Sequence, residues 1–286
     1  QNNNYPRINR IRFLAESKIY LRDNSPTSII NWFDKYPPLG GMGKIKLAEA
    51  YLEKGQVVKI GELIKEGWET ATISKNDLGY YRAKFKKFID SEDHIRRADY
   101  LAWEKKYWDL KRMLKYLPKD QRALYNARQI LMSNSYGVDN AISKVPEYLK
   151  KDPGLEFDRL RWRNRRGRLE GSLEILYRNS IKTEQQMVRP DKWWEQRESV
   201  VRSLIYKKRY KTAYKISSEH ALSAGPSFAE AEWLSGWIAL TFLNSPEYAI
   251  NHFQNFYNNV GYPISLARGA YWLGSSYEKL DEKQLS

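Results

Sequence analysis

Cysteine is absent from this chain of 286 residues, and histidine occurs only three times. Without cysteine the chain has no disulfide, no thiolate nucleophile and no cysteine-based metal site. His94, His220 and His252 lie far apart with no paired spacing, so they do not resemble a set of metal ligands. We therefore expect neither a metal nor a cofactor.

Long apolar runs, alternating strand patterns and common catalytic motifs are also lacking. The longest apolar stretch, near 237–243, is interrupted by Thr241 and is too short to cross a bilayer. The sequence contains no phosphate loop, no His-Glu-x-x-His and no serine elbow. The glycine-rich segment 40–44 follows a Pro-Pro loop instead of a strand, so it is a weak candidate for a phosphate loop.

Positive charge, by contrast, is present in excess. Lysine and arginine number 49 against 34 acidic residues, which gives a net charge of +15. Such an excess favours an anionic partner: nucleic acid, acidic lipid, or an acidic polymer such as a cell-wall glycan with carboxylate-bearing peptides. The sign of the charge does not choose among these partners.

Almost the whole chain has the pattern of short amphipathic helices. Ile8, Ile11, Ala15 and Ile19, for example, fall on one stripe at helical spacing. Roughly 14 helices of about 12–18 residues do not share one core easily, whereas a stack of antiparallel pairs buries their apolar faces. We therefore predict an all-α fold, an α-solenoid or superhelix of tetratricopeptide-like (TPR-like) pairs forming one domain over 1–286.

One short helical pattern occurs twice in the sequence. The segment 231–237, Ala-Glu-Trp-Leu-Ser-Gly-Trp, recurs 39 residues later as 270–276, Ala-Tyr-Trp-Leu-Gly-Ser-Ser. A fixed period of this kind is typical of stacked helix pairs. The second copy is followed by no polar capping helix, so we expect the natural protein to continue beyond this chain.

The most basic segment is 158–168. On a helix, Arg159, Arg163 and Arg166 form one stripe, and arginine forks bind carboxylates and phosphates in two-point geometry. These arginines are therefore candidate substrate-binding residues. The alternative, which we favour, is that they pair with acids on neighbouring helices and stack on tryptophans.

Aromatic residues make up 14% of the chain, and most of them are expected to pack between helices. Trp193 and Trp194 are better candidates for a ligand groove. Adjacent helical residues point about 100° apart, so both are seldom buried at once. We therefore add this pair to the candidate substrate-binding residues.

Four segments together resemble the superhelical domain of soluble lytic murein transglycosylases. The likeness covers about 95–280 and is carried by Pro153-Gly154-Leu155 with Asp158-Arg159-x-Arg161-Trp162-Arg163, Trp193-Trp194 with Arg197 and Arg202, Ala213-Tyr214 with His220, and Ala229-Glu230-Ala231-Glu232-Trp233-Leu234-x-Gly236-Trp237 joined by His252-Phe253 to Pro263-Ile264-Ser265-x-Ala267-Arg268-x-Ala270-Tyr271-Trp272-Leu273-Gly274. The order and spacing of these segments fit that family.

The resemblance implies a ring-like scaffold followed by a separate lysozyme-like domain that carries the catalytic glutamate. That family is periplasmic and acts on peptidoglycan, cleaving the β-1,4 bond between N-acetylmuramic acid and N-acetylglucosamine to leave a 1,6-anhydro end. This chain has no segment that matches the catalytic domain. We therefore assign no catalytic residue here.

Glu198-Ser199 resembles the Glu-Ser pair at that family's catalytic centre, but its surroundings differ. A general acid needs a partly apolar cleft that raises its pKa. Glu198 instead lies in a charged amphipathic segment next to Arg197, and Arg202 follows one turn later. We discount it as a catalytic residue.

The leading hypothesis is a noncatalytic scaffold of a periplasmic lytic transglycosylase that positions murein glycan strands for a separate catalytic domain. The alternative is a helical-repeat scaffold that binds a protein or nucleic acid through a basic groove. The sequence does not define the oligomeric state.

Overall fold

The computed structural model describes residues 5–133, 136–180 and 183–280, and its regular secondary structure is helical. These described residues form sixteen α-helices and four 3-10 helices and contain no strand. The all-α prediction is confirmed, with a few more helices than the roughly 14 expected for a stack of pairs. Over the same residues, no helix combines the length and the apolarity needed to cross a membrane.

The chain divides into two compact units, between Lys150 and Lys151. The boundary coincides with the sequence Lys-Asp-Pro-Gly at 151–154. There the Asp152 side chain accepts a hydrogen bond from the Leu155 N–H at 2.7 Å, and Pro153 opens the next helix. A cap and a proline at this point explain why the chain starts a new element here. The single-domain prediction for 1–286 stays a prediction.

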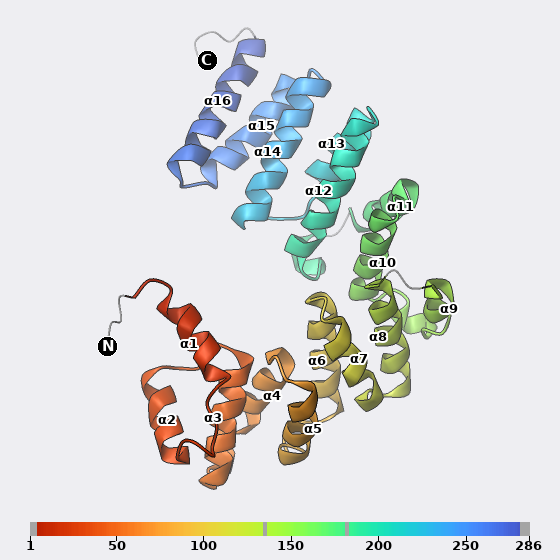
Figure 1. Cartoon of the computed structure of the whole chain (residues 1–286). Coiled ribbons are helices and arrows are strands. Elements are labelled where there is room, and N and C mark those ends of the chain that lie inside the picture. The colour runs from red at the N-terminus through yellow and green to blue at the C-terminus, as the bar shows by residue number, and fades with distance from the viewer. Residues whose placement is uncertain (1–4, 134–135, 181–182, 281–286) are drawn as a thin grey trace. The chain divides into compact units, whose positions relative to one another are not determined.

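The N-terminal unit is built from helices that pack on their neighbours along the chain (Figure 1). Its α-helices are α1 (Ile8–Glu16), α2 (Pro26–Lys35), α3 (Gly41–Glu53), α4 (Gly61–Thr70), α5 (Lys75–Lys84), α6 (Ser91–Trp103), α7 (Tyr107–Met113), α8 (Lys119–Leu131) and α9 (Val138–Ser143). Its 3-10 helices are Val57–Lys59, Leu114–Tyr116 and Glu147–Leu149. Ile45, Trp68 and Trp103 are among its fully buried side chains.

The C-terminal unit repeats this arrangement. Its α-helices are α10 (Pro153–Arg165), α11 (Leu169–Asn179), α12 (Pro190–Tyr206), α13 (Tyr210–Ser218), α14 (Gly225–Phe242), α15 (Pro246–Asn258) and α16 (Pro263–Lys279), with a 3-10 helix at Glu184–Gln186. Consecutive helices pack in pairs, and α12 contacts α10, α11, α13 and α14 (Figure 1). The prediction of paired helices is confirmed within each unit.

The duplicated segment lies in α14 and α16. Trp233 of the first copy and Trp272 of the second meet edge to face, with ring centroids 6.1 Å apart. Small residues allow the close approach: a Cβ at Gly236 would lie 2.8 Å from the ring of Phe253 on α15, and one at Gly269 would lie 3.0 Å from the ring of Tyr257. The repeat therefore marks helices whose small residues admit the aromatic side chains of α15.

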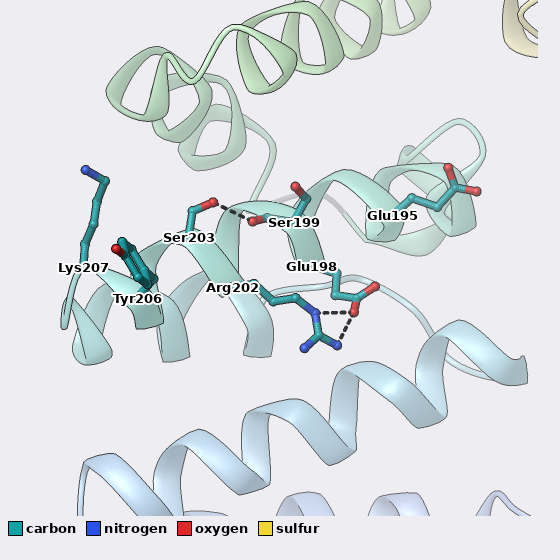
Figure 2. A pocket seen from close by; sticks show the side chains of 7 residues that line it. All are labelled: Glu195, Glu198, Ser199, Arg202, Ser203, Tyr206 and Lys207. Carbon is teal, nitrogen blue, oxygen red and sulfur yellow. Dashed lines mark hydrogen bonds and ion pairs between the residues drawn. The ribbon is translucent and has the colours of Figure 1, made fainter.

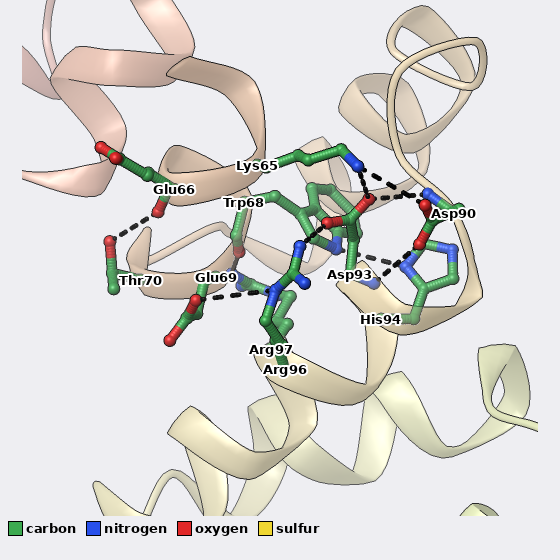
Figure 3. A network of polar contacts seen from close by, with 10 residues as sticks. All are labelled: Lys65, Glu66, Trp68, Glu69, Thr70, Asp90, Asp93, His94, Arg96 and Arg97. Atoms are coloured by element: carbon green, nitrogen blue, oxygen red, sulfur yellow. Dashed lines mark hydrogen bonds and ion pairs between the residues drawn. The ribbon is translucent and has the colours of Figure 1, made fainter. Parts of the chain in front are cut away.

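In the N-terminal unit, a polar network joins α4 to α6 (Figure 3). Asp90 and Asp93 form a capping box at the start of α6, and the ammonium of Lys65 on α4 lies 3.5 Å and 3.7 Å from their carboxylates. The indole N–H of Trp68 donates to Nδ1 of His94 at 3.2 Å. These contacts fix the packing of the two helices, and they account for one of the three histidines.

Buried arginines link helices in both units. Arg97 donates from Nη1 to the carbonyl of Trp68, and Arg197 donates from Nη1 to the carbonyl of Ile216 at 3.1 Å. Both carbonyls lie in the last turn of a helix, where backbone oxygens lack intrahelical partners. Burial lowers the pKa of each guanidinium to about 10, so both remain charged at neutral pH.

Candidate functional site

The three arginines predicted to share one stripe do not all lie together in the structure. Arg159 and Arg163 are four residues apart on α10, on the side that meets α11. Arg166 follows the end of the helix and covers the ring of Trp162, with its guanidinium carbon 5.4 Å from the ring centroid. The predicted stripe is therefore split, because α10 ends before it reaches Arg166.

Arg163 is tied to α11. Its Nη1 donates to the carbonyl of Gly171 and lies 3.1 Å from a carboxylate oxygen of Glu174. The other carboxylate oxygen of Glu174 lies 3.8 Å from the guanidinium of Arg178, which is also 3.9 Å from Glu156. For Arg163 and Arg166, the preferred interpretation, pairing with acids and stacking on tryptophan, is thus confirmed. Binding of a ligand by these arginines stays a prediction.

Arg159 differs from its neighbours. Among the described residues it makes no hydrogen bond and no ion pair, although its side chain is partly buried. Burial lowers the pKa of Arg159, and the nearby charges of Arg163 and Arg178 lower it further. Glu174 and Glu156 act in the opposite direction without reversing the shift. The guanidinium of Arg159 therefore lies near those of Arg163 and Arg178, and among the described residues it makes no hydrogen bond or ion pair of its own.

Trp193 and Trp194 are both buried, with 1% and 2% of their surface exposed. The expectation that one of these neighbouring tryptophans stays exposed, because adjacent helical residues are seldom both buried, is wrong here. Because α12 is covered on more than one side, Trp193 packs edge to face on Phe157 of α10, while the indole N–H of Trp194 donates to Glu230 of α14 at 3.4 Å. Neither ring offers a free face to a sugar, so both are core residues in this structure.

The exposed face of α12 borders a shallow depression of about 550 Å³ (Figure 2). It is lined by Glu195, Glu198, Ser199, Arg202, Ser203, Tyr206 and Lys207. The carboxylate of Glu198 accepts from Nε of Arg202 at 2.7 Å, one helical turn away, as Figure 2 shows. Glu198 is therefore held in an ion pair on an open face of α12 and does not lie in a partly apolar cleft of the kind that a general acid needs.

Sequence reasoning missed a buried cluster around Glu232 on α14. One carboxylate oxygen lies 3.1 Å from Nε2 of His220, and the other lies 2.7 Å from Nδ1 of His252 and 3.3 Å from the amide nitrogen of Asn255. The Tyr214 hydroxyl lies 3.1 Å from Nε2 of His252. Two histidines that are 32 residues apart in the sequence thus meet at one carboxylate.

The hydrogen bonds of this cluster fix the direction in which protons are donated. Nδ1 of His220 accepts from the Leu222 N–H at 3.0 Å, so its Nε2 carries the proton donated to Glu232. Burial alone raises the pKa of Glu232, but the bonds and charges of His220 and His252 outweigh this effect and lower it to about 2. Glu232 is therefore ionised at neutral pH and is unsuited to act as a general acid.

No family model, no curated protein and no solved structure matches this chain. Among the described residues, no group of three or more histidine, aspartate or glutamate side chains is arranged to hold a metal ion. Several residues that carry the family resemblance, including Trp193, Trp194, Arg197 and Glu232, are buried and hold helices together. The α10–α11 arginine cluster, defined as Arg159, Arg163 and Arg178 with Glu156 and Glu174, is the candidate binding site.

Proposed function

We propose that this chain is a noncatalytic scaffold of a periplasmic peptidoglycan lytic transglycosylase. In this role it holds murein glycan strands, through the carboxylates of their peptides, while a separate domain cleaves the bond between N-acetylmuramic acid and N-acetylglucosamine. The proposal combines the family resemblance of the sequence with the chemistry of the arginine cluster.

The observation that carries the proposal is the excess of cations in the α10–α11 arginine cluster. Three guanidinium groups there face two carboxylates, and Arg159 is the one without a partner among the described residues. The chain as a whole carries a net charge of +15. A surface with surplus guanidinium groups attracts polyanions and binds carboxylates in two-point geometry.

The state of the buried and paired acids also supports a scaffold. A lytic transglycosylase needs a glutamate that is protonated near neutral pH, which requires a raised pKa. The pKa of Glu232 is lowered to about 2, and Glu198 is paired with Arg202. Glu232 is therefore ionised and not prepared for proton donation, and we place the chemistry on another domain.

One observation favours the alternative, a scaffold that binds nucleic acid. Trp108 on α7 is 64% exposed, and the ammonium of Lys111 lies 5.3 Å from its ring centroid. An exposed aromatic ring with a cation beside it resembles a platform for stacking a base. This surface lies in the N-terminal unit, apart in sequence from the arginine cluster.

Cosedimentation with purified sacculi tests the proposal. We expect the chain to bind sacculi, to lose binding as salt is raised, and to bind more weakly after the peptide carboxylates have been converted to amides. Sacculi with amidated carboxylates serve as the matched control, because their glycan strands and cross-links are unchanged. Equal binding to both materials would contradict the role of peptide carboxylates.

Two further measurements separate the alternatives. In a salt series with single-stranded RNA, a steeper dependence and a tighter affinity than for sacculi would favour the nucleic-acid scaffold. Incubation of the purified chain with sacculi should release no 1,6-anhydro products. Their release would place catalysis in this chain and refute the noncatalytic role.

A further inference from the structure

Arg159 occupies a position that costs free energy in the absence of a ligand. A partly buried charge loses hydration, and this loss is normally offset by an opposite charge or by hydrogen bonds. Among the described residues Arg159 makes no hydrogen bond and no ion pair. The carboxylates of Glu174 and Glu156 act on it without reversing the lowering of its pKa, and the charges of Arg163 and Arg178 add to that lowering. Local arrangements that oppose stability in this way are typical of binding sites.

The surroundings of Arg159 fit a small oxyanion. Arg163 on the same helix is one turn away, and Arg178 comes from the facing helix α11, so cations approach from two sides. Arg163 and Arg178 are already oriented by Glu174, which spans them at 3.1 Å and 3.8 Å. The guanidinium of Arg159 thus has donors to spare beside two cations that are held in place.

We propose that Arg159, together with Arg163 and Arg178, forms a binding site for a single oxyanion of carboxylate or phosphate size, with Arg159 as the principal donor. A guanidinium offers two parallel N–H groups to such an anion, and one bound negative charge balances the three cations against the two carboxylates. The assignment of this oxyanion to a carboxylate of a murein peptide rests on the proposed function.

Arg166 supplies the matched control. It belongs to the same basic segment and carries the same charge, but it lies beyond the end of α10 and covers Trp162. Arg159→Gln and Arg166→Gln therefore change the net charge equally. Only the first removes a guanidinium that makes no hydrogen bond and no ion pair among the described residues.

The site is tested by titrating the whole chain and following the arginine Nε–H signals by NMR. The probes are inorganic phosphate, muramyl dipeptide, and muramyl dipeptide whose free carboxylate has been amidated. We expect saturable shifts with the first two probes and none with the amidated one. Arg159→Gln should weaken binding at least about tenfold, whereas Arg166→Gln should change it by less than about twofold.

A lysine at the same position separates charge from geometry. Arg159→Lys keeps the positive charge but loses the planar fork, so its affinity should lie between those of the wild-type chain and Arg159→Gln. Because Arg159 makes no bond within the described fold, Arg159→Gln should melt at the same temperature as the wild-type chain or at a higher one. A fall in melting temperature would show a structural role and overturn the site.

The outcomes separate this site from the proposed function. Equal loss in Arg159→Gln and Arg166→Gln, or shifts that never saturate, would show nonspecific attraction and refute the site. Arg159-dependent binding of phosphate without binding of muramyl dipeptide would support the oxyanion site and refute the peptide carboxylate as its ligand. If Arg159→Gln bound sacculi as well as the wild-type chain does, the proposed function would not be contradicted. The result would refute the claim that this site takes part in binding sacculi.

Discussion

Glu232 gives the sharpest test of the electrostatics of the C-terminal unit. Its side chain is 7% exposed, and both carboxylate oxygens accept hydrogen bonds, from His220 and from His252. Glu232→Gln keeps the size of the side chain but removes the charge and turns one acceptor into a donor. In the mutant, an NH2 group would face an imidazole N–H that also donates, and this leaves a buried donor unsatisfied.

The expected loss follows from the pKa of Glu232. A pKa lowered from 4.5 to about 2 corresponds to roughly 3 kcal/mol of free energy of unfolding. Because the pKa of the folded state lies below that of the unfolded state, this stabilisation is complete above about pH 5 and is lost as the pH falls toward 2. By pH 3.5 roughly 1 kcal/mol of it should already be lost.

Urea unfolding of the wild-type chain and Glu232→Gln, followed by circular dichroism from pH 7 to pH 3.5, measures this difference. Because the chain forms two compact units, hydrogen exchange on the peptides of α14 and α15 should locate the loss in the C-terminal unit. Glu198→Gln, which breaks the more exposed pair with Arg202, is the matched control and should cost less than about 1 kcal/mol. A difference for Glu232→Gln that stays constant over this pH range would refute the reasoning.

Two further predictions concern packing, and urea unfolding measures both. Gly236→Ala should destabilise by about 1–3 kcal/mol, because its Cβ would lie 2.8 Å from Phe253. Gly274→Ala should stabilise by up to about 1 kcal/mol, because among the described residues its Cβ would meet no atom within 4 Å outside its own stretch of helix, and the same sign for both would contradict the packing argument. Arg197→Met should change stability by less than about 1.5 kcal/mol, because Nε and Nη2 of Arg197 are buried without a hydrogen-bond partner among the residues that the structure describes. Arg197→Ala should lose about 3 kcal/mol through the cavity, and equal losses would show that the charge itself is needed.

The helices were predictable because their signals are local. Apolar spacing, prolines in the first turn and capping residues act within a few residues, and each acts before any tertiary contact forms. The stop at 151–154 is an example, since Asp152 caps a helix that starts at Pro153 and the boundary between the two units falls beside it. The pairing of helices followed from their short connections.

The site was less predictable, because its geometry depends on which helices surround each residue. The burial of both Trp193 and Trp194 requires partners on more than one side of α12, which the local pattern does not record. Arg178 joins Arg159 only because α11 folds back along α10. The stripe that placed Arg166 with Arg159 assumed a helix that includes Arg166, whereas α10 ends one residue earlier, at Arg165.

The C-terminal unit contains a buried charge with hydrogen-bonding partners, Glu232, and a partly buried charge without them among the described residues, Arg159. This difference distinguishes a structural role from a role in binding. The imidazoles of His220 and His252 both donate hydrogen bonds to the carboxylate of Glu232 and stabilise its charge. Removing that charge should therefore lower the stability of the fold. Over the described residues Arg159 makes no hydrogen bond and no ion pair, so neutralising that charge should leave stability unchanged and alter only binding. If both substitutions reduced stability equally, the arginine cluster would be another strut between helices. A loss of binding without a loss of stability at Arg159 would instead support the proposed oxyanion site.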